Sequence, residues 1–337
     1  MSYLKVQDIG EQGLLERLQS FCPPEIIGDD GAVLTTQPEQ SLVVTTDVLV
    51  DRVHFSEITT SPEDAGWRAA AANLSDLAAM GASPLGITVG LGLPGDVAVS
   101  WVERLYQGIT ECLQKYNTSI VGGDIVRSPV ISISITAFGQ VHPNRIIRRN
   151  NAAVGDAIVV TGVHGASRAG LEMLLNPSLG QILIQGDKQA LIRAHQRPQP
   201  RLDVLPILWK ILDFPDIPLP LSGMDSSDGL ADAVLQICRA SGVGAVLEYA
   251  QIPLPRAFER WLTKEQAMEY ALYGGEDFEL VLCLPIEPAY ELVQLLGEGA
   301  SIIGTITDGS QVILLYKNKE MPDQVLSLNR GFQHFKS

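Results

Sequence analysis

Apolar runs and amphipathic stretches alternate along the first half of this 337-residue chain. The β-branched run 42–50 predicts a buried strand, and the run 84–93 predicts a second strand. Isoleucine alternates with serine or threonine over 131–136, which predicts a strand with one exposed face. Helical periodicity covers 61–80, after a serine cap and a proline, and covers 100–116 as well. Strands that alternate with helices are typical of the α/β class.

The second half repeats this alternation after a polar, basic stretch at 144–151. Beyond that stretch we predict strands at 157–161 and 278–284, with mainly helical segments between them. A single hydrophobic core seldom grows beyond about 250–300 residues. We therefore expect two domains, 1–147 and 148–337, each of the α/β class.

Acidic residues recur where glycines, strand ends and helix starts meet. Carboxylates that are brought together repel one another and raise each other's pKa, so a fold that gathers several of them needs a compensating cation. Oxygen ligands without accompanying His or Cys select Mg²⁺, which proteins usually share with substrate phosphates. The pattern therefore predicts a Mg²⁺–nucleotide enzyme. The acidic positions are Asp29, Asp30, Asp47, Asp76, Asp124, Asp225, Asp228, Glu276 and Asp277.

The amino-acid composition argues against some classes of binding partner. A net charge of −15 argues against nucleic acid or an anionic membrane, and it means that a nucleotide would need cations to bind. The uncharged stretch 77–95 is cut by glycines and prolines, so no membrane span is expected. Four scattered cysteines without paired spacing are expected to be free thiols, mostly buried, as in a reducing cytoplasm.

Several acidic motifs also have a plain structural interpretation. The segment 28–31 can be an ordinary turn, and Thr45 and Asp47, which share one face of a strand, can be capping groups. The segment 122–124 suits a phosphate-binding turn and an ordinary loop equally well. At 225–228 two acids flank two serines at a helix start, where main-chain N–H groups bind phosphate. Because a helix cap needs only one acid, the second one favours a metal.

The remaining candidates lie in a helix and in loops. Asp76 shares a helix face with Asn73, and the helix is so rich in alanine that we expect it to be buried on most sides. A helix C-cap explains the glycines of 274–277 but not the two acids that follow them. His54 and the arginines at 148–149 are ordinary surface residues unless an acid–metal site lies beside them, where they could contact a phosphate.

Together these segments resemble the thiamine-monophosphate kinase family, within the superfamily of aminoimidazole ribonucleotide synthetase-like ATP enzymes. The resemblance implies a two-domain fold of that superfamily, with the nucleotide between the domains and a homodimer whose N-terminal domains pair their sheets. It implies transfer of the γ-phosphoryl group of ATP to thiamine phosphate, which yields thiamine diphosphate and ADP. The matching segments, which span nearly the whole chain, are 28–33, 45–55, 73–81, 122–124, 224–230 and 274–280.

The resemblance also implies which residues bind each ligand. Several Mg²⁺ ions would be held by Asp30, Thr45, Thr46, Asp47, Asp76, Asp124, Asp225 and Asp228. ATP would be contacted by Tyr106, Gly123, Asp124, Arg149 and Ser227, and thiamine phosphate by His54, Glu276 and Phe332. Phe332 stands where the family often has tryptophan, and a phenyl ring can also stack on thiamine. The segment 150–152 departs from the family's usual Ser-Gly-Ala, which leaves both Arg148 and Arg149 open as the nucleotide contact.

No covalent nucleophile and no general base are expected. The acceptor phosphate has a second pKa near ~6 and is largely ionised at neutral pH, so no base has to remove its proton. We therefore expect His54 to position the phosphate as a hydrogen-bond donor rather than to act as a proton acceptor. One rival interpretation is another ATP enzyme of the superfamily, of the cyclo-ligase type, against which the segments 53–55 and 274–280 speak by resemblance. A second is an ATP-using maturation protein, which would be expected to end in a reactive cysteine, whereas the last cysteine here is Cys283.

Overall fold

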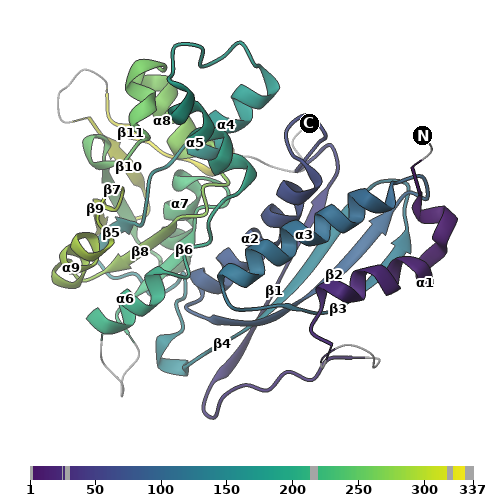
Figure 1. Ribbon diagram of the computed structural model, residues 1–337. Coiled ribbons are helices and arrows are strands. Elements are labelled where there is room, and N and C mark those ends of the chain that lie inside the picture. The colour runs from purple at the N-terminus through teal and green to yellow at the C-terminus, as the bar shows by residue number, and fades with distance from the viewer. Residues whose placement is uncertain (1–2, 25, 27–30, 213–218, 317–321, 331–337) are drawn as a thin grey trace. The chain divides into compact units, whose positions relative to one another are not determined.

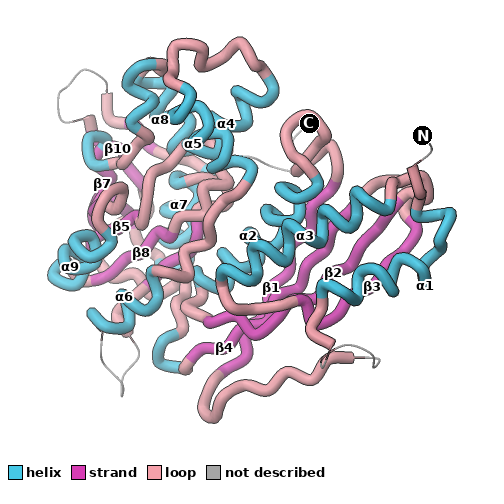
Figure 2. The backbone as a smooth tube through the Cα atoms, in the orientation of Figure 1, coloured by secondary structure: helices cyan, strands magenta, loops and turns pink. Residues whose placement is uncertain are grey.

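The computed structural model describes residues 3–24, 26, 31–212, 219–316 and 322–330. The chain divides into two compact units, which Figures 1 and 2 show as ribbon and tube. Unit 1 comprises Met1–Leu77 and Ala82–His142, and unit 2 comprises Ala78–Gly81 and Pro143–Ser337. The division therefore falls after residue 142, where the sequence places it after 147.

Within the described part of unit 1, four strands form one mixed sheet in the order β1-β4-β2-β3. The pairs β1/β4 and β4/β2 are antiparallel, and β2/β3 is parallel. One row of the register runs from Asp47 through Ile135 and Val89 to Gly123. The strands are β1 (Ser41–Val50), β2 (Ser83–Leu93), β3 (Ile120–Arg127) and β4 (Ser132–Val141).

Helices cover one face of this sheet. They are α1 (Val6–Leu18), α2 (Pro62–Ala79) and α3 (Val99–Lys115), and α2 and α3 lie along the strands in Figure 1. Ala70, Leu74 and Leu77 of α2 are fully buried, which confirms that this alanine-rich helix is enclosed on most sides. The helix stops at Gly81, whose φ of 75° suits a residue without a side chain.

The opposite face of the sheet is not covered within unit 1. Along β1, Leu42, Val44 and Val48 are 54%, 54% and 49% exposed. The prediction that 42–50 is buried is therefore wrong for one of its two faces. Successive side chains of a strand point to opposite faces, and helices cover only one face here, so an unbroken apolar run does not guarantee burial on both sides.

The third strand runs further than the sequence indicates. The sequence assigns 122–124 to a turn or a loop, but β3 continues through these residues to Arg127. A Cβ atom at Gly123 would overlap the carbonyl oxygen of Val89 on β2. These glycines therefore permit close strand pairing inside the sheet rather than ending a strand.

In the described part of unit 2, seven strands form a sheet in the order β11-β10-β7-β9-β5-β8-β6. The pair β7/β10 is parallel, and the other pairs are antiparallel. The prediction from 157–161 and 278–284 is confirmed by β5 and β8. The strands are β5 (Ala157–Val160), β6 (Ser222–Asp225), β7 (Gly244–Glu248), β8 (Leu280–Leu284), β9 (Ser301–Thr307), β10 (Val312–Leu315) and β11 (Gln324–Val325).

Helices cover both faces of this second sheet. Ile158 and Val160 of β5 pack into a core with α7 and α8, whereas Ala157 and Val159 pack into another core with α6 and α9. The helices α4 and α5 form a third apolar cluster with α8. The chain thus has a two-domain α/β fold with two mixed sheets, as the α/β prediction requires. The helices are α4 (Ala166–Leu175), α5 (Gln185–Gln196), α6 (Val204–Ile211), α7 (Leu230–Ser241), α8 (Lys264–Tyr273) and α9 (Ile286–Leu296).

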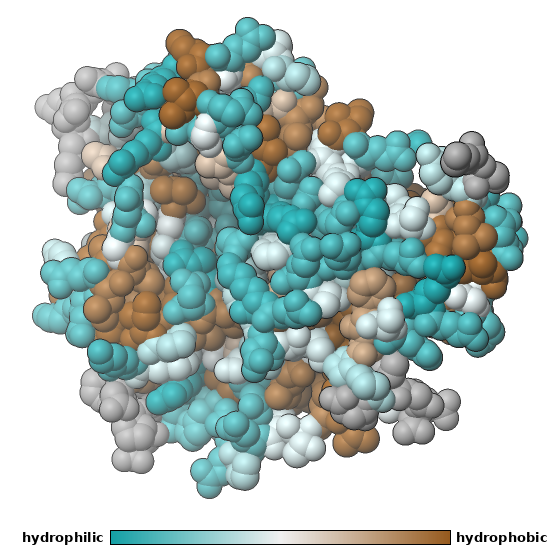
Figure 3. Space-filling view, in the orientation of Figure 1, coloured by the Kyte–Doolittle hydropathy of each residue, from teal (hydrophilic) through white to brown (hydrophobic). Residues whose placement is uncertain are grey.

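The helices in the described ranges include none that is both long enough and apolar enough to cross a membrane. On the face shown in Figure 3, hydrophilic residues are widespread and the hydrophobic residues form separate patches. Isolated exposed apolar side chains of this kind are ordinary on protein surfaces.

The helices α2 and α3 approach each other at two glycines. A Cβ atom at Gly66 would overlap the carbonyl oxygen of Leu105, and one at Gly108 would overlap that of Glu63. We predict that Gly108→Ala lowers the free energy of unfolding by about 1–3 kcal/mol through overpacking, measured by urea titration. The control is Gly186→Ala in α5, where the added methyl group meets open space and ~1 kcal/mol of helix propensity is gained. Equal losses in the two variants would contradict the close packing of these helices.

Candidate active site

In unit 1 the polar residues of β1 and α2 come together. The Thr45 hydroxyl donates a hydrogen bond to the Asp76 carboxylate. The main-chain N–H of Asp47 donates to Asn73 Oδ1 at 3.2 Å. Asn73 is fully buried, and its amide donates in turn to the Ala69 carbonyl at 2.9 Å. The Thr45 hydroxyl and the main chain of Asp47 are thus both held by α2.

Thr46 points to the other face of β1. Its hydroxyl donates to the Ile135 carbonyl at 2.8 Å and accepts from the Thr136 hydroxyl at 3.2 Å. A ligand on the Asp47 face could therefore reach Thr46 only through its main chain. Two further candidates, Asp30 and Phe332, lie outside the described residues.

His54 closes a tight turn after β1. Its Nδ1 accepts a hydrogen bond from the Val50 N–H at 3.0 Å, and Arg68 donates to its carbonyl oxygen at 3.2 Å. With Nδ1 acting as an acceptor, the proton of the neutral ring resides on Nε2, which is then a hydrogen-bond donor. A neutral His54 ring in this state can donate a hydrogen bond only from Nε2.

A cavity of about 190 Å³ in unit 1 brings three predicted nucleotide contacts together. Tyr106, Gly123 and Asp124 line it, beside Cys22 and apolar residues of α1. Burial raises the pKa of Tyr106, so its hydroxyl stays neutral. Drug-sized ligands need pockets of about 300 Å³ or more, so this cavity suits a planar base rather than a whole nucleotide. The strand that carries Gly123 and Asp124 is separated from β1 by β4 and β2.

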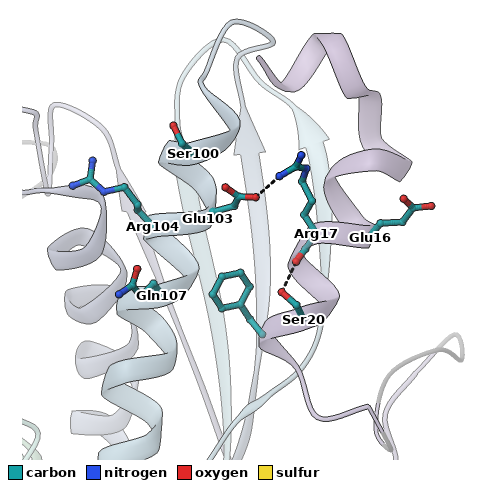
Figure 4. Close-up of a pocket in the computed structure, with 8 residues that line it drawn as sticks. Glu16, Arg17, Ser20, Ser100, Glu103, Arg104 and Gln107 are labelled. Atoms are coloured by element: carbon teal, nitrogen blue, oxygen red, sulfur yellow. Dashed lines mark hydrogen bonds and ion pairs between the residues drawn. The ribbon is translucent and has the colours of Figure 1, made fainter. Parts of the chain in front are cut away.

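A wider cavity of about 510 Å³ lies between α3 and the segment formed by α1 and the following 3₁₀ turn (Gln19–Phe21), as Figure 4 shows. Its arginines are already engaged with carboxylates: Arg17 with Glu103 at 2.6 Å, and Arg104 with Glu63 through bonds of 2.6 and 2.8 Å. The cavity therefore offers little unbalanced charge to an anion. The other residues that line it are Glu16, Ser20, Phe21, Ser100 and Gln107.

In unit 2 the segment 225–228 joins β6 to the start of α7. Asp225 is buried at the end of β6, and the Ser227 hydroxyl donates to its Oδ1 at 3.4 Å. Asp228 is exposed, one residue before Gly229, whose φ of 104° lets the chain turn into the helix. Two carboxylates thus lie at a helix N-terminus, where the helix dipole and main-chain N–H groups favour negative charge.

The charge of Arg149 affects the pKa of an acid at the start of α7. Burial raises the pKa of Asp232 in the first turn of α7, and the charge of Asp228 raises it further, whereas the charge of Arg149 lowers it. Arg148 is held through its carbonyl oxygen, which accepts from the Ser222 hydroxyl at 2.8 Å. The charge of Arg149 therefore reaches Asp232 in the first turn of α7.

Glu276 projects from a turn with unusual backbone geometry. Gly275, Glu276 and Phe278 have φ angles of 70°, 59° and 53°, the left-handed region. For a residue with a side chain this conformation costs roughly 1–2 kcal/mol. The Glu276 N–H donates to the Ser227 carbonyl at 2.7 Å, which ties the turn to the 225–228 segment. The cost of this conformation at Glu276 indicates that its surroundings impose it.

Asp277 anchors this turn to the N-terminus of α4. Its carboxylate accepts hydrogen bonds from the main-chain N–H groups of Gly165 at 2.6 Å and Ser167 at 2.9 Å. Burial raises the pKa of Asp277 to about 7, against the opposing effect of these two N–H groups. The second acid of the 274–277 motif therefore serves the structure.

His164 packs beneath the 225–228 segment. Its Nδ1 lies 3.2 Å from the Gly162 carbonyl, and its Nε2 lies 3.1 Å from the Ser226 hydroxyl. A carbonyl oxygen can only accept, so Nδ1 carries the proton and Nε2 accepts from Ser226. Burial lowers the pKa of this histidine to about 4, so the ring is neutral at physiological pH.

Several residues that hold these loops are not identified by any sequence pattern. Thr161 donates to Glu279 at 2.6 Å, and Arg201 bonds both to Glu279 and to the Thr161 carbonyl. Glu279 is the acid just before the apolar strand β8, which was the one available signal. Its partners lie far away in sequence, at positions that no local pattern connects.

The donor chemistry of both units suits Mg²⁺. The grouped side chains offer carboxylate and hydroxyl oxygens, as in the Thr45–Asp76 and Asp225–Ser227 pairs. In the described ranges, no three His, Cys, Asp or Glu side chains gather closely enough to hold a metal by themselves. Mg²⁺ commonly takes one or two carboxylates and completes its shell with water and substrate phosphates. The residues therefore fit a metal that arrives with a polyphosphate rather than one held in a closed protein cage.

Family models match most of the chain. The AIR synthase related protein N-terminal domain matches residues 28–141, and the corresponding C-terminal domain matches 153–317. A thiamine-monophosphate kinase from Synechococcus elongatus is 52% identical over 335 residues, which cover 99% of each protein.

Solved structures agree with these matches. The structure of AaThiL complexed with AMPPCP and TMP is similar with a TM-score of 0.72 and 33% identity, covering 91% of this chain and 94% of that one. Thiamine-monophosphate kinase from Stenotrophomonas maltophilia gives a TM-score of 0.77 and 32% identity, with 89% and 95% covered. The similarity therefore extends over both units of the fold.

The buried, neutral His164 makes stability depend on pH. In the unfolded chain a histidine takes up a proton below about pH 6.5, whereas in the folded protein the pKa is lowered to about 4. Protonation thus favours the unfolded state as pH falls from 6.5 to 4, and the contribution reaches about 3 kcal/mol. The free energy of unfolding of the wild type should fall as the pH is lowered. We predict that His164→Gln reduces this fall by about the same amount, measured by urea unfolding between pH 4.5 and 7.5. Parallel curves for the two proteins would contradict a neutral His164.

Proposed function

This chain belongs to the thiamine-monophosphate kinase family of AIR synthase-related proteins, and we propose that its acidic motifs take part in moving the γ-phosphoryl group of ATP onto thiamine phosphate. The products are thiamine diphosphate and ADP. The observation that carries this function is 52% identity over 99% of both chains with a thiamine-monophosphate kinase. At the level of residues, what supports it is that Thr45 of β1 bonds to Asp76 of α2, and that Asp225 and Asp228 flank the start of α7.

The nucleotide is proposed to place its base in the cavity beside Tyr106, with Gly123 and Asp124 next to it. The small volume of that cavity and the neutral tyrosine support this placement. Ser227 and Arg149 are proposed to contact the phosphates, because they lie at or near the N-terminus of α7. The complex of the relative AaThiL with AMPPCP, an ATP analogue, and TMP supports ATP as the co-substrate.

Magnesium ions are proposed to be held by oxygen ligands in both units. Bound Mg²⁺ supplies positive charge that neutralises and orients the phosphate groups. Arg149 adds a cationic side chain, and the start of α7 adds main-chain N–H groups, both of which stabilise charge that develops during transfer. The proposed ligands are Asp30, Thr45, Thr46, Asp47, Asp76, Asp124, Asp225 and Asp228.

The acceptor is proposed to bind through three residues with different chemistry. His54 donates from Nε2 to the phosphate, Glu276 faces the cationic ring, and Phe332 stacks on it. The Glu276 side chain is 34% exposed, so its carboxylate can meet a ligand. Since a phosphate monoester is largely ionised above pH ~6, its oxygen attacks directly, and neither a general base nor a covalent intermediate is required.

A homodimer is proposed to form through the uncovered face of the unit 1 sheet. Leu42, Val44 and Val48 present a row of apolar side chains there. A second copy of the same face would bury them and would satisfy the two-fold symmetry of common homodimers.

A cytoplasmic location is proposed from the cysteines. Cys112, Cys238 and Cys283 are buried thiols, and Cys22 is a half-buried thiol. Burial raises the pKa of Cys283, which keeps it as an unreactive thiol. Free thiols of this kind suit a reducing compartment.

The function is tested by incubating the protein with Mg²⁺, ATP and thiamine phosphate and identifying the products by chromatography. We predict thiamine diphosphate and ADP in equal amounts, and a loss of at least ~100-fold in kcat for Asp47→Asn, because a carboxylate that stabilises transferring phosphates is removed. Asp96→Asn, an exposed acid of unit 1, serves as the matched control and should behave as wild type. Free phosphate without thiamine diphosphate would indicate a cyclo-ligase reaction instead. Normal turnover of Asp47→Asn would contradict the proposal that Asp47 binds Mg²⁺.

The dimer is tested by placing a charge on the uncovered sheet face. We predict that Val44→Glu halves the mass measured by size-exclusion chromatography with light scattering, because the interface would bury the carboxylate. The control is Ile58→Glu, which changes a side chain that is 71% exposed in a loop outside the sheet. A monomeric wild type, or a Val44→Glu variant that keeps the wild-type mass, would show that this face is not the interface.

A further inference from the structure

His195 is a buried residue in the last turn of α5 whose side chain reaches the Glu276 turn. Its Nδ1 lies 3.6 Å from Glu276 Oε2 and 3.2 Å from the Ser167 hydroxyl. The histidine side chain is 3% exposed and the glutamate side chain is 34% exposed. One end of this pair is therefore fixed in the protein, and the other end faces outward.

The chemistry of the two oxygens determines the state of this nitrogen. An ionised carboxylate accepts hydrogen bonds and cannot donate them, and a hydroxyl can accept as well. A nitrogen flanked by both is attracted to both only when it carries a proton. A ring that carries its proton on Nδ1, whether neutral or charged, therefore attracts the Glu276 carboxylate, whose Oε2 lies 3.6 Å away, toward α5.

The start of α4 links this contact to the backbone of the turn. The main-chain N–H of Ser167 holds the buried carboxylate of Asp277, and the Ser167 hydroxyl contacts His195. On the other side, the Ser227 carbonyl accepts from the N–H of Glu276. The backbone of Glu276 is thus fixed from two directions, and His195 acts on its side chain, whose rotatable bonds the backbone does not control.

We propose that His195 is a positioning residue that orders the Glu276 carboxylate before the acceptor binds. A cationic ring then meets a charge that is already in place, so less conformational freedom is lost on binding. His195 acts through Glu276 and does not touch the acceptor itself. This inference rests on the proposed function, in which Glu276 faces the ring of thiamine phosphate.

The test compares steady-state kinetics of His195→Ala with wild type. The expected result is a KM for thiamine phosphate raised about tenfold, with KM for ATP and kcat changed less than about twofold, because only binding of the acceptor loses an ordered partner. His195→Asn keeps an N–H donor close to the position of Nδ1 and should restore most of the affinity. Unchanged KM for thiamine phosphate in His195→Ala would overturn the proposal.

Two further variants separate positioning from a merely structural role. Leu191→Ala removes a buried side chain one turn earlier in the same helix, and it should lower the melting temperature without changing the KM for thiamine phosphate. If Leu191→Ala raises that KM as much as His195→Ala does, general loosening of α5 explains the effect and the proposal fails.

A double-mutant cycle shows whether His195 works through Glu276. Once Glu276→Gln has removed the carboxylate, adding His195→Ala should raise the KM no further. Additive effects would overturn the proposal. A wild-type protein that makes no thiamine diphosphate would defeat the kinase function and this inference together. A wild type that makes it, with a normal KM for Glu276→Gln, would defeat the inference alone.

Discussion

Repulsion between negative charges limits how this protein can bind its substrates. The chain carries a net charge of −15, and its candidate ligands are mostly carboxylates, yet its two substrates are themselves anions. Side chains such as Asp76 and Asp225 can lie beside phosphates only when cations stand between them. In the proposed function this positive charge comes from Mg²⁺, from Arg149 and from the helix start at α7. The oxygen-rich character of the motifs follows from that need.

The two units supply this chemistry from rigid frames. In unit 1, Asn73 of a buried helix holds the main chain of Asp47, and Thr45 bonds to Asp76. In unit 2, buried groups hold the loops whose tips are exposed: His164 bonds to Ser226, and Asp277 binds the start of α4. Groups that are fixed before the reaction need no reorganisation when charge develops, which is the main advantage of an electrostatic site.

Sequence patterns predict the helices and strands of this fold better than they predict which faces of these elements are buried and how they pack. The boundaries of α2 and β2 follow from caps, glycines and apolar runs, and Asp76 was correctly expected in a helix buried on most sides. The same patterns mislead for β1, because an apolar run does not reveal that helices cover only one face. They also mislead for β3. Glycines usually indicate a turn, but here they permit β3 to pair closely with β2. The strands β7 and β10 were not predicted at all.

The contacts that position the site were the least predictable part. His164, His195 and Arg201 act on the motif residues from 62, 81 and 78 positions away in sequence, at Ser226, Glu276 and Glu279. Such partners are set by the packing of the sheet and not by any local periodicity. The motif acids could therefore be found from the sequence, whereas the groups that orient them required the structure.

The role of divalent ions can be measured by calorimetry of AMPPCP binding to the wild-type protein. Binding is compared with free Mg²⁺ and after removal of divalent ions by a chelator. If cations offset the repulsion between the acidic motifs and the phosphates, the affinity should fall by at least ~100-fold without Mg²⁺, which corresponds to roughly 2.7 kcal/mol. Equal affinity in the two conditions would contradict the central claim that divalent ions let this acidic site hold a nucleotide.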